Sequence, residues 1–323
     1  MKRRHEFLDI LLGAIKRETE AFNYYYRASQ KSPSGESRSL LLQLAEEERR
    51  HRTILLQEYQ SYRRLVSGDD REVFLGTDRV SYHLPEEPTF KRIQSLKPVE
   101  LAVVSLPTEF VGGDFFDTFI LKDEGKMGLL IFDVMGHGRE ATELKAKARV
   151  EWDKLKELYL EKEAHSVLLS PSSVITHLNR LLLNECRRLA SFLSMFYAVL
   201  DLSKKRLIYA SAGHEPPLLF RGKGYAQLME GDLLLCIDKE KTYREVPREI
   251  HSGDVLVMFT DGVVESMNSE EEEFGVGRLI GTVEENRNQA PSEIIRHVLT
   301  ALRDFVEGKP ITDEFTLAVA KLR

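Results

Sequence analysis

Four aspartates, each beside a glycine or at the end of an apolar run, constrain this chain more than any other feature. They lie in four short motifs, at 112–114 (Gly-Gly-Asp), 133–138 (Asp-Val-Met-Gly-His-Gly), 260–262 (Thr-Asp-Gly) and 312–316 (Thr-Asp-Glu-Phe-Thr). At such positions a strand gives way to a turn, so a carboxylate projects from rigid backbone. Carboxylate oxygens are ligands that suit Mg²⁺ or Mn²⁺ rather than zinc or copper. The motifs together therefore predict a hard-metal centre.

The four motifs carry Asp114, Asp133, Asp261 and Asp313. Any one of these motifs alone would predict only a turn, because turns use Asp-Gly and Gly-Gly-Asp constantly. Strands that converge at one edge of a sheet sandwich would bring the four carboxylates together only if a cation offset their repulsion. We therefore expect a shared metal site at such an edge.

Length and composition set the broad class of protein. The chain has 323 residues, of which 42% are apolar, enough for two domains or for one large domain with an appendage. No apolar run reaches the roughly 18 to 20 residues that span a bilayer, and the charged start at 1–6 leads into an amphipathic helix. The two cysteines, Cys186 and Cys236, lie far apart in apolar surroundings, so neither a disulfide nor a Cys-based zinc site is predicted. These features predict a cytoplasmic protein with no membrane segment.

The charge is unevenly distributed. The net charge is −6, but residues 1–66 carry 13 Lys/Arg and 9 Asp/Glu, a balance of +4 that leaves −10 for the remainder. The basic residues alternate with acids at helical spacing, which is typical of a solvated helix face. We therefore expect no nucleic-acid partner.

Leucines and isoleucines at three- and four-residue steps predict two amphipathic helices, at 5–31 and 37–66. The Ser-, Pro- and Gly-containing stretch between them predicts a loop. Because a helical hairpin leaves one apolar face uncovered, residues 1–66 should pack on the rest of the chain or on a second copy. A homodimer is the expectation that we prefer. Residues 67–96, with several glycines and prolines and little periodicity, predict a linker.

The remainder, 97–323, mixes strand and helix patterns. Short turns join the strand-like runs, and paired helical patterns interrupt them, which favours an α+β fold with antiparallel sheets covered by helices. The predicted strands are 99–106, 115–121, 127–133, 195–200, 206–211, 217–221, 243–250, 255–259 and 315–321, and the predicted helices are 139–163, 171–189, 274–286 and 291–306.

Five segments of this region resemble a known family. Residues 111–117, 133–138, 211–217, 259–265 and 312–317, in this order, are similar to motifs of the metal-dependent Ser/Thr protein phosphatases of the PPM class, in the SpoIIE-like and RsbU-like branch. The resemblance covers about 97–323. It implies an α-β-β-α sandwich with a two-metal centre at one end of the sheets.

The resemblance also implies a role for each motif aspartate. Asp133 would bridge two Mn²⁺ or Mg²⁺ ions, the Val134 carbonyl would be a further ligand, and Asp114, Asp261 and Asp313 would complete the inner or outer shell. The two ions would activate a water that attacks phosphorus in line. All four aspartates are present, so the resemblance implies an active enzyme rather than a pseudophosphatase.

Two departures from the family pattern and two histidines leave questions open. Glu314 replaces the usual second aspartate of the last motif and Phe116 a common tyrosine, although neither is one of the four metal positions. His137 is a candidate general acid for the leaving alkoxide. A turn histidine between glycines can equally serve only to position the loop. For His214 a structural role at a corner between strands is favoured.

The first helices carry a second acidic pattern. Glu48 and His51 form a Glu-x-x-His pair, which lies on one face of a helix, and Glu18 fits the matching position on the preceding helix. The pattern resembles half of a ferritin-like, rubrerythrin-type di-iron bundle. A complete iron site would require a dimer of four helices, and acidic helix faces also produce this pattern by accident. If the site is real, its iron state could bias the attached domain.

The resemblance implies a serine/threonine protein phosphatase of a bacterial signalling pathway, with the helical hairpin as sensor or dimeriser. It implies a phosphorylated anti-sigma-factor antagonist, a small STAS-type domain, as substrate. Two alternatives belong to other classes. One is a non-catalytic adaptor that binds metal or phosphoprotein. The other is a ferritin-like oxidoreductase or iron store, which the large remainder of the chain disfavours.

Overall fold

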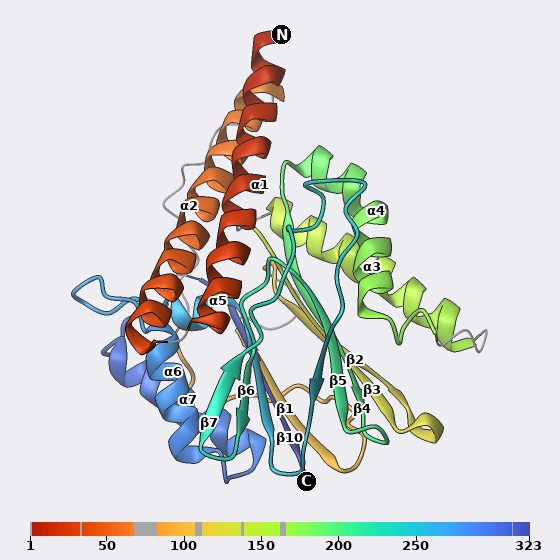
Figure 1. The fold of residues 1–323 in the computed structure, drawn as a ribbon, viewed down its shortest axis with the longest axis vertical. Helices are drawn as coiled ribbons and strands as arrows, with labels where there is room; N and C mark the ends of the chain where they lie inside the picture. The colour runs from red at the N-terminus through yellow and green to blue at the C-terminus, as the bar shows by residue number, and fades with distance from the viewer. Residues whose placement is uncertain are drawn as a thin grey trace.

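The chain folds into four layers, helix, sheet, sheet and helix, with a long helical hairpin along one side (Figure 1). The computed structural model describes residues 2–32, 34–67, 83–106, 112–136, 139–161, 166–311 and 313–323. The predicted α+β class and α-β-β-α sandwich are confirmed.

Two antiparallel five-stranded sheets form the centre of the sandwich. One sheet has the order β1-β10-β9-β6-β7 and the other β2-β3-β4-β5-β8. The first sheet contains β1 (Val99–Leu106), β10 (Phe315–Leu322), β9 (Val255–Phe259), β6 (Leu218–Arg221) and β7 (Gly224–Gln227). The second contains β2 (Phe115–Leu121), β3 (Lys126–Val134), β4 (Leu193–Asp201), β5 (Arg206–Ala212) and β8 (Val246–Glu249).

Alternation along the strands divides the core into layers. On β3, Leu129 and Ile131 pack between the two sheets, against residues such as Met258, whereas Leu130 and Phe132 face the helices. Side chains of a strand point alternately to its two faces, so one strand serves two cores. Both faces of β3 are therefore apolar, as its nearly continuous hydrophobic run requires.

Helices cover both outer faces of the sandwich. The face of the β2–β8 sheet is covered by α3 (Arg139–Glu161) and α4 (Pro171–Leu189). The other sheet is covered by the short α5 (Asp261–Val264), α6 (Gly275–Asn286) and α7 (Pro291–Phe305). Strand β2 also binds α3 directly, because Asp117 accepts hydrogen bonds from Trp152 Nε1 at 2.7 Å and from Lys156 Nζ.

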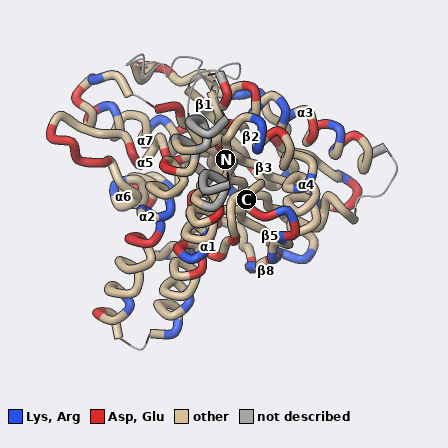
Figure 2. The backbone as a smooth tube through the Cα atoms, turned by 90° about the horizontal axis from the view of Figure 1, so that it is seen from above, with Lys and Arg blue, Asp and Glu red and all other residues tan. Residues whose placement is uncertain are grey.

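The N-terminal hairpin consists of α1 (Lys2–Lys31) and α2 (Gly35–Ser67), and it packs on its own chain. The Tyr59 and Phe192 rings are 5.2 Å apart, and Lys16 Nζ lies 2.7 Å from Asp238 Oδ2. Leu11, Ile15 and Leu56 belong to the same core as α3 and α4. Figure 2 shows basic and acidic residues alternating along both helices. The apolar face that the sequence left without a partner is thus covered by the sandwich.

The observed elements follow the predicted ones closely, with a few differences in number and bounds; for example, β8 (Val246–Glu249) is shorter than the strand predicted at 243–250. Strand β7 and helix α5 were not predicted, and the helix after the first loop begins at Gly35, two residues earlier than expected. In the linker, 83–97 contain no helix or strand, and 68–82 lie outside the described residues. None of the described helices is long and apolar enough to cross a membrane.

The expectation of unpaired cysteines is wrong. Cys186 of α4 and Cys236 form a disulfide with a Cα–Cα distance of 6.2 Å. The fold brings them together because α4 holds the 236–238 segment, with Asn179 accepting from Cys236 N at 2.6 Å and donating to Asp238 O at 2.9 Å. Because the two cysteines are 50 residues apart in the sequence, no local pattern predicts this contact.

Candidate metal centre

Antiparallel pairing places the four motif aspartates at one edge of the sandwich. Asp114 precedes β2 and Asp133 lies near the end of β3, its antiparallel neighbour. Asp261 follows β9 and Asp313 precedes β10, which are also antiparallel neighbours. The start of one strand and the end of the next share an edge, so each pair of motifs meets there.

Hydrogen bonds across the two sheets hold Asp114. Thr260 Oγ1 donates to Asp114 Oδ2 at 2.6 Å and itself accepts from Thr316 N at 2.8 Å. The other carboxylate oxygen, Asp114 Oδ1, is buried and has no hydrogen-bond partner among the described residues. A buried, unpaired carboxylate oxygen is costly unless a ligand such as a cation occupies its lone pairs.

The Gly-Gly step before Asp114 permits a close approach of backbone. Gly112 has a φ of +97°, and a Cβ at Gly113 would lie 2.6 Å from the Val134 carbonyl oxygen. Glu314 accepts hydrogen bonds from Gly113 N at 2.5 Å and from Asp114 N at 3.3 Å. The residue that departs from the family pattern thus binds the backbone of a metal motif, a contact that the sequence did not reveal.

The electrostatics of this edge favour bound cations. Burial raises the pKa of Asp133 and Asp261 well above the usual range, and repulsion from Asp261 and from Asp313, respectively, adds to this. Burial, followed by repulsion from Glu314, raises the pKa of Asp114 to about 7. Carboxylates that resist ionisation together are stabilised by a shared positive ion.

The residues at this edge fit a hard divalent ion. They offer carboxylate oxygens, the Val134 carbonyl and one unpaired buried oxygen. No three of the described aspartates bring their oxygens within 4.8 Å of one another, so their spacing is wider than a single closed cage. Asp313 is exposed and accepts from Glu314 N at 2.9 Å. The chemistry of the donors therefore suits Mg²⁺ or Mn²⁺.

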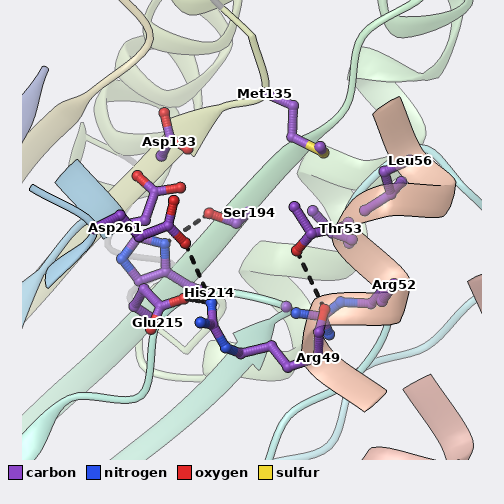
Figure 3. A pocket seen from close by; sticks show the side chains of 13 residues that line it. Arg49, Arg52, Thr53, Leu56, Asp133, Met135, Ser194, His214, Glu215 and Asp261 are labelled. Carbon is purple, nitrogen blue, oxygen red and sulfur yellow. Dashed lines mark hydrogen bonds and ion pairs between the residues drawn. The ribbon is translucent and has the colours of Figure 1, made fainter. Parts of the chain in front are cut away.

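A pocket lies beside the aspartates, and α2 forms one of its walls (Figure 3). Arg49 of α2 reaches across it, with Nη1 2.8 Å from Glu215 Oε1 and 3.7 Å from Glu265 Oε1. Asp133 and Asp261 line the opposite side. The lining residues are Arg49, Arg52, Thr53, Leu56, Asp133, Met135, Ser194, Gly213, His214, Glu215, Leu234, Asp261 and Glu265. The hairpin is thus in direct contact with the candidate centre.

His214 is a buried neutral imidazole of this pocket. Its Nδ1 lies 2.8 Å from Ser194 Oγ, and its Nε2 is buried without a hydrogen-bond partner among the described residues. Burial lowers the pKa of His214 to about 3, although the backbone of Phe259 acts in the opposite direction. The ring therefore stays uncharged near neutral pH. The other histidine of interest, His137, lies outside the described residues.

A second acidic group lies on the hairpin. One ligand atom each from Glu18, Glu48 and His51 falls within 4.8 Å of the other two. His51 Nδ1 is 3.3 Å from Glu48 Oε2 and 3.9 Å from Glu18 Oε2. A hydrogen bond with Glu48, and then burial, raises the pKa of Glu18. The sequence-predicted half site therefore converges, although His51 is 59% exposed.

Sequence reasoning missed the residues that join the hairpin to the pocket. Arg49 and Arg52 belong to a pattern interpreted as a solvated helix face, yet the Arg49 side chain is only 15% exposed. The Arg49 partner Glu215 stands 166 residues away, and no local pattern links such positions. Glu215 does directly follow His214 in a motif segment, which was the one available hint.

Two family models match the chain. The model described as Stage II sporulation protein E (SpoIIE) matches residues 123–323. The model described as Rubrerythrin matches residues 9–93, which include both helices of the hairpin.

Three individual proteins that resemble the chain share 27% or less of their aligned residues with it. Phosphoserine phosphatase RsbU of Bacillus subtilis is 27% identical over 237 residues, which cover 71% of this chain and 65% of RsbU. The chain thus spans somewhat less than two thirds of that relative. The SiaA-PP2C domain of Pseudomonas aeruginosa has a TM-score of 0.59 at 16% identity, covering 83% of this chain and 96% of that domain. The PP2C phosphatase domain structure of SpoIIE from Bacillus subtilis has a TM-score of 0.56 at 20% identity, covering 71% and 64%. These structures establish the sandwich fold.

Proposed function

The chain belongs to the SpoIIE family, and from this premise we propose that it is a metal-dependent protein phosphatase that hydrolyses phosphoserine or phosphothreonine. The observation that carries the proposal is the group of aspartates at one sheet edge, of which Asp114 is buried and Asp133 and Asp261 are half-buried, and which repel one another beside a pocket. A shared family alone would leave the chemistry open, because function lies in the site.

The aspartates would hold two Mn²⁺ or Mg²⁺ ions. Asp133 would be the central ligand, the Val134 carbonyl a further one, and Asp114, Asp261 and Asp313 would complete the ligand set. Such ions lower the pKa of a bound water and balance charge on a phosphoryl group. The unpaired Asp114 Oδ1 and the close approach of Gly113 to Val134 support this assignment.

Other residues of the chain would orient these ligands and handle the proton. Thr260 and Glu314 fix the Asp114 motif through the hydrogen bonds described above. The neutral His214 ring would present Nε2 near the pocket without adding charge. His137 remains the proposed general acid for the leaving alkoxide, on sequence grounds alone.

The experiment is phosphate release from a phosphoserine protein by EDTA-treated protein, with Mn²⁺ or Mg²⁺ added back. We expect turnover that depends on the metal and is lost in Asp261→Ala. Asp123→Asn, which removes an exposed carboxylate of the 122–124 turn, is the matched control. Wild-type protein that binds Mn²⁺ but releases no phosphate would favour the non-catalytic adaptor instead.

The proposed substrate is a phosphorylated anti-sigma-factor antagonist of the STAS type. The support is the similarity to RsbU, whose name is phosphoserine phosphatase. Comparing turnover of such a domain with that of an unrelated phosphoserine protein tests this choice. Equal kcat/KM on both would contradict it.

A second candidate function concerns the hairpin. We propose that Glu18, Glu48 and His51 bind iron as half of a site completed by a second copy of the chain, and that this site regulates the phosphatase. The convergence of three ligand atoms within 4.8 Å and the match to the Rubrerythrin model favour it. Exposed apolar side chains on the hairpin, including Ile10 at 61% and Ile54 at 55%, support a homodimer. Iron content and molar mass of the same preparation, measured for wild type and Glu48→Gln, test both parts.

A further inference from the structure

Two arginines of α2 face the catalytic pocket, but among the described residues only Arg49 forms direct ion pairs with carboxylates. Arg49 is held by Glu46, Glu215 and Glu265, with its shortest N–O distances at 2.8 Å. Arg52, three residues later and hence on the same helix face, has no carboxylate within 4.0 Å among the described residues. The two arginines therefore differ in their ion pairing, so we do not expect the same role for both.

Arg52 is a cation in a confined place with no direct ion pair among the described residues, although Glu215 and Glu46 act on it from a greater distance. Its Nε is buried and has no hydrogen-bond partner among the described residues. Its guanidinium carbon lies 6.0 Å from the centre of the Phe22 ring of α1, a distance at which a cation–π contact is weak. Burial, followed by repulsion from Arg49, lowers the pKa of Arg52 to about 10, so it still carries its charge at neutral pH. A partly buried guanidinium whose Nε lacks a hydrogen-bond partner and that has no carboxylate in direct contact gains from a ligand that supplies both.

The pocket around Arg52 suggests which ligand that is. Asp133 and Asp261 line the far wall, and Arg52 lines the near one. Arg52 also borders a smaller adjoining pocket, whose carboxylates, Glu215 and Asp232, form ion pairs with other cations among the described residues and none with Arg52. An anion placed between the metal wall and Arg52 would be attracted from both sides once the aspartates hold cations.

We propose that Arg52 is the phosphate-binding residue of the catalytic pocket, supplied by the N-terminal hairpin, and that Arg49 is the anchor that holds α2 in place. This inference rests on the proposed phosphatase function. A planar guanidinium binds two oxygens of a phosphoryl group at once, which suits a phosphomonoester better than a point charge does. The hairpin is then part of the substrate site, and any displacement of α2 changes substrate affinity directly.

The test uses the full chain with Mn²⁺ and compares Arg52→Met with Arg50→Met. Arg50 is a matched control, because it lies on the same helix, is 63% exposed and does not line the pocket. Two readouts are measured: the inhibition constant of inorganic phosphate during turnover, and phosphate binding by calorimetry. We expect Arg52→Met to weaken phosphate about ten- to hundredfold in both readouts and to raise KM more than it lowers kcat. Arg50→Met should stay within about twofold.

Arg52→Lys separates the contribution of charge from that of shape, because lysine keeps the positive charge but lacks the planar guanidinium. Binding intermediate between wild type and Arg52→Met is expected. Arg52→Gln is the second variant if Arg52→Met loses its near-ultraviolet circular dichroism. Equal phosphate affinity in wild type and in a folded Arg52 variant would overturn the proposal, as would a wild type that binds no phosphate.

Calorimetry separates this proposal from the phosphatase itself. A wild type without turnover would refute the phosphatase function, yet phosphate binding that depends on Arg52 would still establish the anion site. Conversely, turnover with unchanged KM and phosphate inhibition in Arg52→Met would leave the phosphatase intact and refute the role of Arg52.

Discussion

The acidic groups at the sheet edge and on the hairpin hold their oxygens in different ways. The sheet-edge aspartates stand at or beside the ends of strands whose backbone the ladders fix, and burial is the main cause of the raised pKa values of Asp133 and Asp261. Glu18, Glu48 and His51 stand on helix surfaces at the ends of long side chains, and a hydrogen bond between the glutamates is the main cause of the raised pKa of Glu18. The charge at the sheet edge therefore favours a bound cation, whereas the hairpin glutamates can be satisfied by sharing a proton.

One helix connects the two groups. Glu48 and His51 lie on one face of α2, and Arg49 and Arg52 contribute to the pocket from another. A shift or rotation of α2 that accommodates a metal on the hairpin would move both arginines relative to the aspartates. Helix α2 is therefore the element through which the hairpin would act on the pocket.

The largest expected effect is on catalysis at the sheet edge. Asp133→Asn should lower Mn²⁺-dependent kcat/KM about a thousandfold or more, because it removes a charge that no neighbour replaces. Glu48→Gln should change the same quantity by less than about tenfold, since it acts only through α2. Steady-state phosphate release measures both. Similar losses of kcat/KM in the two variants would contradict the expectation that the sheet edge is catalytic and the hairpin acts only indirectly.

The next effect concerns the anchor between hairpin and sandwich. Arg49→Gln should destabilise the chain by about 3 kcal/mol, because Glu215 and Glu265 would lose their shared cation at a largely buried position. Arg50→Gln, at an exposed position, should cost about 0.5 kcal/mol or less. Urea unfolding followed by circular dichroism measures the difference. A stable Arg49→Gln protein would mean that apolar contacts alone hold α2.

The raised pKa values at the sheet edge predict a pH-dependent stability without metal. A carboxyl whose folded-state pKa is raised keeps its proton better when folded, so its stabilising effect is complete below about pH 4 and is lost as pH rises. For Asp114 the loss extends to about pH 7. Metal-free protein should therefore melt lower at pH 8 than at pH 5, and Mn²⁺ should raise Tm by about 3 °C or more at pH 8. The rise in Tm caused by Mn²⁺ should be smaller at pH 5 than at pH 8, and Asp133→Asn should reduce this rise at pH 8.

The smallest expected effect is on metal binding by the hairpin. His51→Ala should weaken iron binding about tenfold, because it removes one of three ligands that is itself exposed. Mn²⁺ binding at the sheet edge should be unchanged. Iron titration followed by optical absorbance, with Mn²⁺ binding followed by calorimetry, separates the two. Unchanged iron binding in His51→Ala would indicate that the glutamates are only a solvated pair.

Much of the fold and of the sheet-edge site could be predicted because the relevant signals are local. Apolar runs that end at Asp133 or begin after Asp313 mark strand ends, and Gly113 marks a close approach of backbone. Glu-x-x-His spacing likewise places Glu48 and His51 on one helix face, because residues three apart are neighbours on a helix surface. Periodicity and turn chemistry carry this information within a few residues of chain.

The contacts between distant segments could not be predicted in this way. Arg49 has the composition of a solvated helix residue and becomes a buried anchor only because the sandwich presents Glu215 and Glu265 to it. The same holds for the disulfide between Cys186 and Cys236, which depends on how α4 packs on a later loop.

By itself, then, the sequence determined the strands, the helices and the order of the aspartate motifs, because backbone preference and hydrophobic period are written in neighbouring residues. Only the tertiary structure decided that α2 lies against the aspartate edge and that Arg52 remains there without a direct ion pair among the described residues. Those outcomes depend on which surfaces exclude water when the layers close, and charge pairing and burial across long chain separations are set at that step.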